Sequence, residues 1–236
     1  MERKLQQRYD NLTKAAFEGT TYQCGVTMTH VSVITEIPFP KVMPTMNKIE
    51  TNFFSSANKI YCDIETTSLH KDADILQIAA TSETESCDLY ILPSKSISPA
   101  SSDITGLTVI GKNMFYRGRK VDTHSLKDAI LLFVKFLESH QPCVLIGHNF
   151  HTFDFPRIIR AFELTSMTDH LCKNTLGAVD TLPLFKKAHP GLEKYSQEHL
   201  VGLFVKQTYS AHNALSDVKS LQKLYTTVGV SNQQMS

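Results

Sequence analysis

The sequence contains no long hydrophobic run, and its beginning has no apolar block of the kind found in secretory signal peptides. Its longest uninterrupted apolar run, residues 129–134, is far shorter than the roughly 20 residues that a membrane-spanning helix needs. We therefore expect neither a membrane protein nor a secreted one.

The sequence also lacks an excess of either charge. It carries 24 Lys and Arg residues against 23 Asp and Glu residues, which gives a formal net charge of +1. Proteins that grip long duplex nucleic acid through many phosphates need a broad basic face, and this balance argues against one. A nucleic-acid partner would therefore have to be held locally, over a few nucleotides.

Closely paired cysteines are absent as well. The five cysteines are scattered along the chain and form no Cys-x-x-Cys pair. This spacing favours reduced thiols over a disulfide framework or a zinc site. We therefore expect an intracellular location.

The length and composition allow one substantial core, because 42% of the 236 residues are hydrophobic. Residues 38–58 contain three prolines and no sustained periodicity, which predicts a linker. Residues 1–37 combine a helical pattern with a stretch rich in Val, Thr and Ile, which predicts a short N-terminal extension of one helix and one strand. The main domain is expected over residues 59–230.

Short β-rich segments and amphipathic segments fill the main domain. The predicted strands are residues 60–64, 75–81, 89–92, 143–147 and 176–179. The predicted helices are one that starts after Ser125 and others over residues 153–163, 194–205 and 214–228. Three early strands followed by alternating strands and helices are typical of an α/β domain in which helices cover a sheet.

Asp63 and Glu65 are two acidic residues on a strand that is predicted to be buried. They lie two positions apart on a predicted strand with apolar neighbours, so both side chains point to the same face. Two carboxylates brought together out of water need a counter-charge, which a hard cation such as Mg²⁺ or Mn²⁺ can supply. The alternative is that the strand frays there and both acids face solvent.

Asp217 lies within the apolar stripe of the last predicted helix, where an unpaired carboxylate is costly. His212 precedes that helix and is expected in the loop before it, close enough to share a site with Asp217. A lone histidine is more often a structural residue than a catalytic one. Here its proximity to a buried acid favours a shared site.

Asp154 stands where a predicted strand runs into a helix, beside the apolar stripe of that helix. An acid in the first turn also interacts favourably with the helix dipole. Taken alone, the dipole explanation is preferred over a metal-binding one.

Together these residues resemble the three motifs of the DEDDh, DnaQ-like 3′→5′ exonucleases. The matching motifs are Asp63-x-Glu65, His148-Asn149 with Phe153-Asp154, and His212-x-Ala214-x-x-Asp217. Within that family, residues 153–156 are similar to TREX-type enzymes. Residues 75–80 and 195–200 are similar to the exonuclease-like domain at the C-terminus of long PML isoforms and to its stand-alone animal relatives.

The resemblance implies a ribonuclease-H-like mixed sheet of five strands, flanked by helices, that carries the four acids. It implies hydrolysis from a free 3′ end to nucleoside 5′-monophosphates, with two Mg²⁺ ions as cofactors and Mn²⁺ able to substitute. The expected metal ligands are Asp63, Glu65, Asp154 and Asp217. His212 is the expected general base, because a histidine can accept a proton near neutral pH.

The resemblance also assigns the substrate contacts. The residues expected around the terminal nucleotide are Thr66, Thr67, Leu69 and Asn149. Two positions depart from the family pattern, since Ser68 replaces the usual Gly and Thr105 the usual His. The expected partners are 3′ ends of single-stranded nucleic acid, DNA or RNA. A nuclear location follows from the PML-like resemblance alone, and the sequence leaves open whether the chain forms a homodimer.

Two other functions stay open. The chain could be a catalytically silent exonuclease-fold module that binds nucleic acid or protein, in which case Mn²⁺ would give no thermal shift. It could also be an endonuclease of the same superfamily, which would cut circular single strands.

Overall fold

The computed structural model describes residues 56–228. The predicted N-terminal extension (1–37) and most of the predicted linker (38–58) lie outside the described residues. The last two residues of the predicted main domain (59–230) lie outside them as well.

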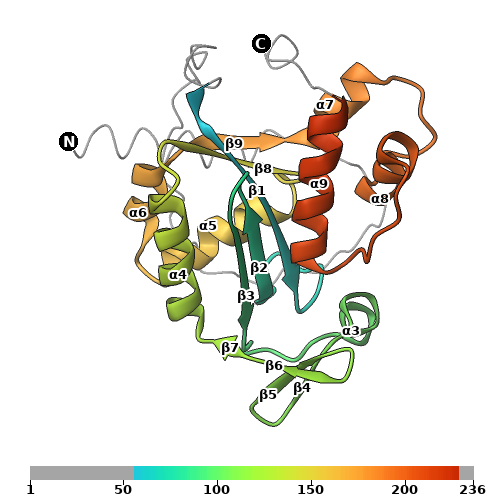
Figure 1. The fold of residues 1–236 in the computed structure, drawn as a ribbon. Helices are drawn as coiled ribbons and strands as arrows, with labels where there is room; N and C mark the ends of the chain where they lie inside the picture. The colour runs from blue at the N-terminus through green and yellow to red at the C-terminus, as the bar shows by residue number, and fades with distance from the viewer. Residues whose placement is uncertain (1–55, 229–236) are drawn as a thin grey trace, which may run out of the picture.

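A mixed sheet forms the centre of the described structure. Its strands are β1 Asn58–Thr66, β2 Ile75–Thr81, β3 Ser86–Ile91, β7 Thr123–His124, β8 Cys143–Gly147 and β9 Thr175–Asp180. They lie in the order β7-β3-β2-β1-β8-β9 (Figure 1). β2 is antiparallel to β1 and β3, whereas β8 is parallel to β1 and β9. The predicted mixed sheet is confirmed, but it has six strands rather than five, because the two-residue β7 adds an edge beside β3.

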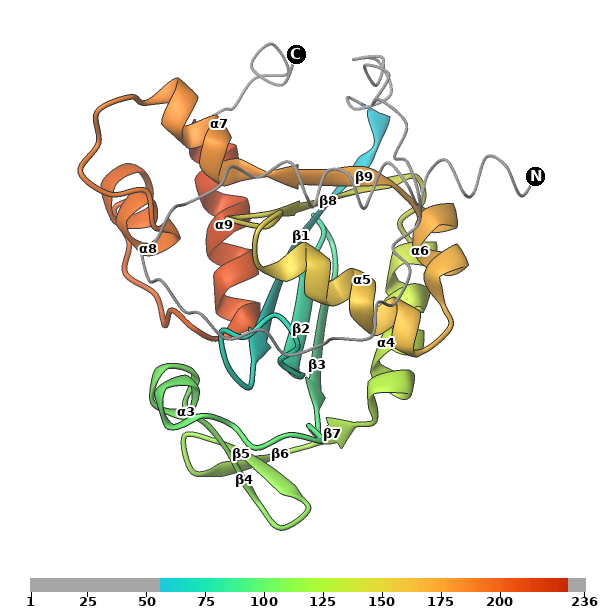
Figure 2. The same cartoon turned by 180° about the vertical axis from the view of Figure 1, so that it is seen from behind.

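Helices cover both faces of this sheet. One face packs against α4 Leu126–Glu138, α5 Asp154–Leu164 and α6 Thr168–Asn174. The other face packs against α7 Thr181–Ala188, α8 Gln197–Leu200, a π-helical turn Val201–Val205 and α9 Ala214–Val228. Figure 2 shows α5 in front of the sheet, and Figure 1, seen from the opposite side, shows α9 in front of it. Because both faces are covered, all seven residues of β2 are buried.

The helix start predicted at Ser125 is confirmed. Its hydroxyl accepts a hydrogen bond from the Asp128 amide and donates one to the Asp128 carboxylate, so the cap satisfies an amide at the N-terminus of α4. Pro156 lies in the first turn of α5, where its missing N–H costs nothing. The helix predicted over residues 194–205 starts later, after the capping residue Ser196.

A second, smaller sheet lies beside the lower end of the central one. It follows helix α3 Pro99–Thr105 and consists of β4 Leu107–Ile110, β5 Asn113–Tyr116 and β6 Arg119–Val121 (Figure 1). Leu107 and Met114 pack with Leu76 in a separate apolar cluster. The sequence did not predict this sheet, because strands of three or four residues are too short to show alternation.

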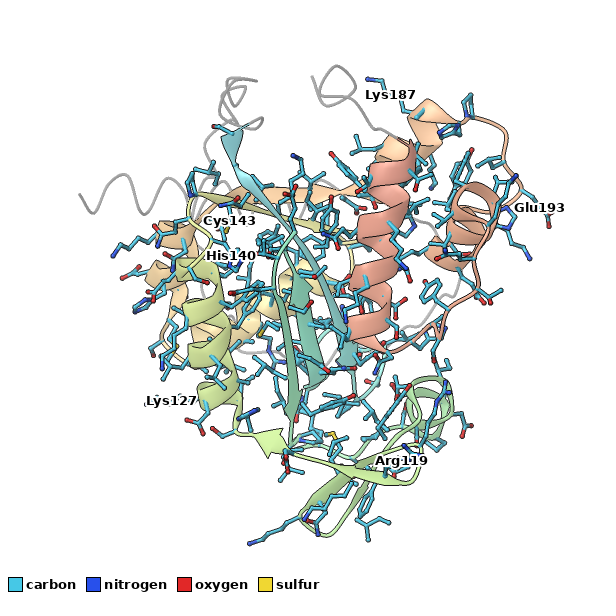
Figure 3. All side chains as sticks on the ribbon, in the orientation of Figure 1. Arg119, Lys127, His140, Cys143, Lys187 and Glu193 are labelled. Carbon is cyan, nitrogen blue, oxygen red and sulfur yellow. The ribbon has the colours of Figure 1, made fainter. Side chains whose placement is uncertain are left out.

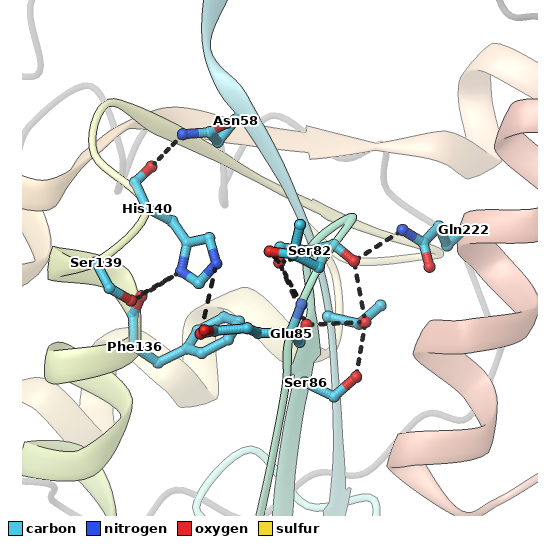
Figure 4. Close-up of polar contacts among 10 residues, drawn as sticks. Asn58, Ser82, Glu85, Ser86, Phe136, Ser139, His140 and Gln222 are labelled. Atoms are coloured by element: carbon cyan, nitrogen blue, oxygen red, sulfur yellow. Dashed lines mark hydrogen bonds and ion pairs between the residues drawn. The ribbon is translucent and has the colours of Figure 1, made fainter.

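Polar contacts hold the end of the sheet at which β1 begins (Figure 4). The Asn58 side-chain amide donates to the His140 carbonyl at 2.9 Å, which connects β1 to the end of α4. The Gln222 side-chain amide donates to the Ser82 carbonyl at 2.9 Å, which connects α9 to the turn after β2. These contacts fix the beginning of β1 against α4 and the turn after β2 against α9.

Candidate active site

Asp63 and Glu65 lie on β1, on the face that packs against α9. Ile60, Cys62 and Ile64 alternate with them and pack on the other side, against α4 and α5. β1 stays paired with β2 as far as Thr66, and Glu65 is only 9% exposed. The alternative in which the strand frays and both acids face solvent is therefore wrong.

Asp217 meets these two acids from the first turn of α9. The Tyr209 hydroxyl donates a hydrogen bond to one carboxylate oxygen of Asp217 at 2.9 Å, and the backbone amide of Asn213 donates to the other at 3.1 Å. One oxygen each of Asp63, Glu65 and Asp217 lie within 4.8 Å of one another. Three carboxylates from two distant parts of the chain therefore form one cluster.

Asp154 approaches the same strand from α5. It is 4% exposed, and the backbone amide of Ile64 donates to its carboxylate at 3.2 Å. The position in the first turn keeps the favourable helix dipole, but the side chain also reaches across to the middle of β1. Asp154 lines the same pocket as the other three acids but does not belong to the group whose oxygens lie within 4.8 Å of one another.

The turn that delivers Asp154 depends on two backbone features. A Cβ at Gly147 would lie 2.1 Å from the Phe150 ring, so only glycine lets this ring pack against the end of β8. Asn149 has φ +56, the left-handed conformation that Asn tolerates well. The chain therefore reverses within a few residues and begins α5 beside β1.

Burial disfavours the charged form of all four acids. Burial, followed by the neighbouring carboxylates, raises the pKa of Asp63 well above its ordinary value and that of Glu65 to about 8. Burial also raises the pKa of Asp154 well above its ordinary value and that of Asp217 to about 6. Hydrogen bonds to Asp217, and His212 nearby, oppose its shift.

The acid cluster fits a divalent cation. Within residues 56–228, no Lys or Arg forms an ion pair with Asp63, Glu65 or Asp217. Their donor atoms are carboxylate oxygens, which Mg²⁺ and Mn²⁺ prefer. A cation bound among them would supply the counter-charge that the protein does not.

His212 lies in the loop before α9, as expected, and it lines the pocket together with Asp217. It is exposed and adopts the left-handed conformation, with φ +63. An imidazole at the mouth of an acid-lined pocket can exchange protons with water in that pocket.

The pocket has a volume of about 370 Å³. Three of the four expected substrate residues, Thr66, Leu69 and Asn149, line it. Thr67 does not line it. Thr67 is buried, and its hydroxyl accepts a hydrogen bond from the Asp74 amide, so it shapes the loop after β1 instead.

Sequence reasoning missed several residues that line the pocket or hold its acids in place. Gln197 donates to the Asp217 backbone carbonyl at 2.9 Å, and Tyr209 holds the carboxylate. Ile104 is 53% exposed at the pocket, as a second apolar side chain beside Leu69, which is 85% exposed. Gln197 falls within a segment already noted for its family resemblance, whereas nothing local marks Tyr209.

His148 is a structural residue of the site. One ring nitrogen lies 2.9 Å from the Thr181 hydroxyl and the other 2.7 Å from the Tyr195 carbonyl. Burial lowers its pKa, which favours the neutral imidazole. It therefore ties the end of β8 to the segment that precedes α8.

Comparison with known proteins points to one family. The family model described as "Exonuclease" (RNase_T) matches residues 60–225. Three-prime repair exonuclease 1 of Homo sapiens is 26% identical over 142 residues, which cover 56% of this chain and 43% of that protein. The chain thus spans less than half the length of this curated relative.

Solved structures share the fold. The zinc-bound E. coli exonuclease I–single-stranded DNA complex superposes with a TM-score of 0.61 and 17% identity, over 76% of this chain and 42% of that one. E. coli exonuclease I in complex with a dT13 oligonucleotide gives a TM-score of 0.60 and 18% identity, over 74% and 42%. At this identity the likeness concerns the fold alone.

Proposed function

The chain belongs to the exonuclease (RNase_T) family, and we propose that it is a metal-dependent 3′→5′ exonuclease that releases nucleoside 5′-monophosphates from single-stranded nucleic acid. The observation that carries this proposal is that acidic residues far apart in the sequence meet in one pocket. Four acids and a histidine from three separate segments of the chain line one pocket. A fold that placed so many unpaired carboxylates together without a use for them would lose stability.

We assign the metal ligands from the geometry of the cluster. Asp63, Glu65 and Asp217 would hold one Mg²⁺, and Asp63 with Asp154 would hold the second, with Mn²⁺ able to substitute. Two such ions would lower the pKa of a water molecule and stabilise negative charge on the phosphate and the leaving 3′ oxygen.

His212 would act as the general base. Its ring lines the pocket from the exposed edge, where it can take a proton from the attacking water and pass it to solvent. Asp217, close to it, would stabilise the protonated ring. Tyr209 would keep the Asp217 carboxylate in place through its hydrogen bond. Gln197 would hold the Asp217 backbone through the carbonyl and contacts the carboxylate at 3.4 Å.

The substrate would enter past two apolar side chains. Leu69 and Ile104 are both exposed at the pocket, and they would contact the bases at the 3′ end. Thr66 and Asn149 would face the sugar and phosphate of the terminal nucleotide. Single-stranded DNA in complex with E. coli exonuclease I supports a single-stranded substrate.

We also propose to which branch of the family the chain belongs, where in the cell it acts and from which end it cuts. The similarity of residues 75–80 and 195–200 to PML-type domains supports membership of that branch and a nuclear location. The similarity to Three-prime repair exonuclease 1 supports the TREX-type branch and the 3′→5′ direction.

The test uses 5′-labelled linear DNA and RNA strands and a circular single strand, each with Mg²⁺ or with chelator. We expect a ladder of labelled products that shorten from the 3′ end in Mg²⁺ only, and uncut circles. Cut circles would identify an endonuclease. Release of the labelled 5′ nucleotide first, or no cleavage of any strand, would overturn the proposal.

A further inference from the structure

The small sheet formed by β4, β5 and β6 carries an unbalanced positive charge, and we refer to residues 107–121 as the basic sheet. Its four cations are the exposed residues Lys112, Arg117, Arg119 and Lys120. No Asp or Glu lies between Asp103 and Asp122 in the sequence. Within residues 56–228, none of the four cations forms an ion pair.

Arg117 places one end of the basic sheet at the edge of the pocket. Its backbone amide donates to the Gly106 carbonyl at 2.8 Å, directly after α3, and residues of α3 line the pocket. Its guanidinium donates to the Ser210 hydroxyl at 3.0 Å, two residues before His212. Arg117 therefore joins the end of α3 to the loop that carries His212, and both segments contribute residues to the pocket lining.

The hairpin between β5 and β6 keeps its cations beside aromatic rings. Arg117 and Gly118 have φ +48 and +78, which makes a tight two-residue turn and fixes the register of the strands. Arg119 pairs with Tyr116, and Lys120 pairs with Phe115. Both aromatic residues are half-buried. The Arg117 guanidinium lies over the Tyr116 ring, 5.5 Å from its centre, so Phe115 is the ring better placed to meet a base. Figure 3 shows Arg119 on this sheet, near α3.

This combination is what a single nucleic-acid strand requires. Cations bind the phosphates and accessible rings stack with bases, without reading the sequence. The need for such a surface is acute here, because the acids of the pocket repel the phosphates of an incoming strand. Cations bound among the acids would offset part of that repulsion. With a net charge of +1 over the whole chain, a local basic surface is the protein's own means to offset the rest.

We propose that the basic sheet binds the sugar–phosphate backbone of the single strand a few nucleotides upstream of the one in the pocket. This inference rests on the proposed function, because it extends the path of the same substrate. Arg119 and Lys120 are neighbours on the edge strand β6 and point to its two faces, so they contact phosphates of a strand that passes along this edge. Arg117 holds the sheet against the loop that carries His212.

The test compares the double variant R119A/K120A with wild type, since neither substitution removes the bond between Arg117 and Ser210. The matched control is K135A/K187A, which removes the same charge from α4 and α7, away from the basic sheet. The probe is a fluorescent single-stranded 15-nucleotide DNA in the presence of chelator. Anisotropy is measured from low to moderate salt.

We expect R119A/K120A to bind the probe roughly 10-fold more weakly at low salt. The slope of log K against log salt should fall by about 1.4, since each phosphate contact on a single strand contributes about 0.7. K135A/K187A should match wild type. Equal affinity and slope in wild type and R119A/K120A, or no binding by wild type, would overturn the inference.

A second readout separates this inference from the proposed function. The p-nitrophenyl ester of thymidine 5′-monophosphate has no upstream phosphate, so R119A/K120A should hydrolyse it at the wild-type rate while its KM for the 15-nucleotide strand rises. An equal KM would overturn the inference. If wild type cleaves neither compound, the proposed function fails, and the binding measurement still decides on the basic sheet.

Discussion

At the scale of single residues, Asp217 is a largely buried acid that forms no ion pair with a Lys or Arg of residues 56–228, but its carboxylate accepts hydrogen bonds. The two shortest bonds come from the Tyr209 hydroxyl and the backbone amide of Asn213. They hold the carboxylate in place although burial raises its pKa. Asp217→Asn keeps the shape and removes the charge. We expect hydrolysis to fall by roughly 10³-fold or more, because a metal ligand is lost.

The Asp217→Asn variant is measured by single-turnover hydrolysis and by thermal denaturation, which should show a Tm close to that of wild type. Asp169→Asn, an exposed acid on α6, is the matched control and should be fully active. Wild-type activity in Asp217→Asn would remove this acid from the site.

His212 offers a test of proton transfer that is separate from metal binding. His212→Ala should lower kcat by about 10²–10⁴-fold if the ring accepts the proton of the attacking water. The Tm increase caused by Mn²⁺ should persist in the variant, because the four acids remain. An unchanged kcat would contradict the general-base role.

The buried acids predict how stability depends on pH in the absence of metal. Burial and neighbouring carboxylates raise the pKa of Glu65 to about 8 in the folded protein, whereas an unfolded Glu titrates at about 4.3. Between these values the folded state binds more protons than the unfolded state, so the contribution of Glu65 to stability falls as pH rises.

Glu65→Gln should therefore raise the Tm of the metal-free protein by a few degrees at pH 8 and change it little at pH 5, where Glu65 is already protonated. Circular dichroism in chelator measures both values. A Tm below that of wild type at pH 8 would show that the charged carboxylate is stabilised without a cation.

At the scale of elements, α5 is joined to the loop after β1 by Arg157. This side chain is 7% exposed, and its guanidinium donates to the carbonyls of Phe153, Leu69 and His70 at 2.6, 2.8 and 3.0 Å. The guanidinium also lies 3.9 Å from the centre of the Phe153 ring. Arg157 thus connects two parts of the site: the loop that carries Leu69 and the helix that carries Asp154.

Arg157→Lys should weaken this link, because an ammonium cannot reproduce the planar fork of donors. We expect stability to fall by about 1–3 kcal/mol and the KM for oligonucleotides to rise more than kcat falls. Urea denaturation and steady-state kinetics measure these effects. The control Arg160→Lys changes a residue on the same helix that forms none of these bonds.

The elements that the sequence predicted are the long and periodic ones. The five main strands and the helices α4, α5 and α9 show clear alternation or an apolar stripe, because each buries one face or both. The elements that it missed are short. α3 and α6 have seven residues each, α7 has eight, and β4 to β6 have three or four, too few to show a period clearly.

The same limit applies to the site. Asp63, Glu65 and Asp217 could be predicted because a carboxylate in an apolar pattern is costly, and that cost is visible locally. The contact of Tyr209 with Asp217 could not be predicted, since it exists only after the loop folds back on α9. Thr67 was expected at the substrate, but its bond to Asp74 depends on a loop closure that the sequence does not display.

At the scale of the whole molecule, the fold places strongly repelling groups at one end of a sheet that is buried on both faces. The rest of the core is apolar and closely packed, and it supplies the stability that the acid cluster lowers. No helix among the described residues is long and apolar enough to cross a membrane. A bound cation would return part of the lost stability through linkage to the folded state.

Anomalous diffraction from crystals grown with Mn²⁺ and a nucleoside 5′-monophosphate tests the convergence of the acids most directly. We predict two manganese peaks, one among the carboxylates of Asp63, Glu65 and Asp217 and one between Asp63 and Asp154. Crystals that lack manganese in this pocket, or that bind it only at other surfaces, would contradict the account.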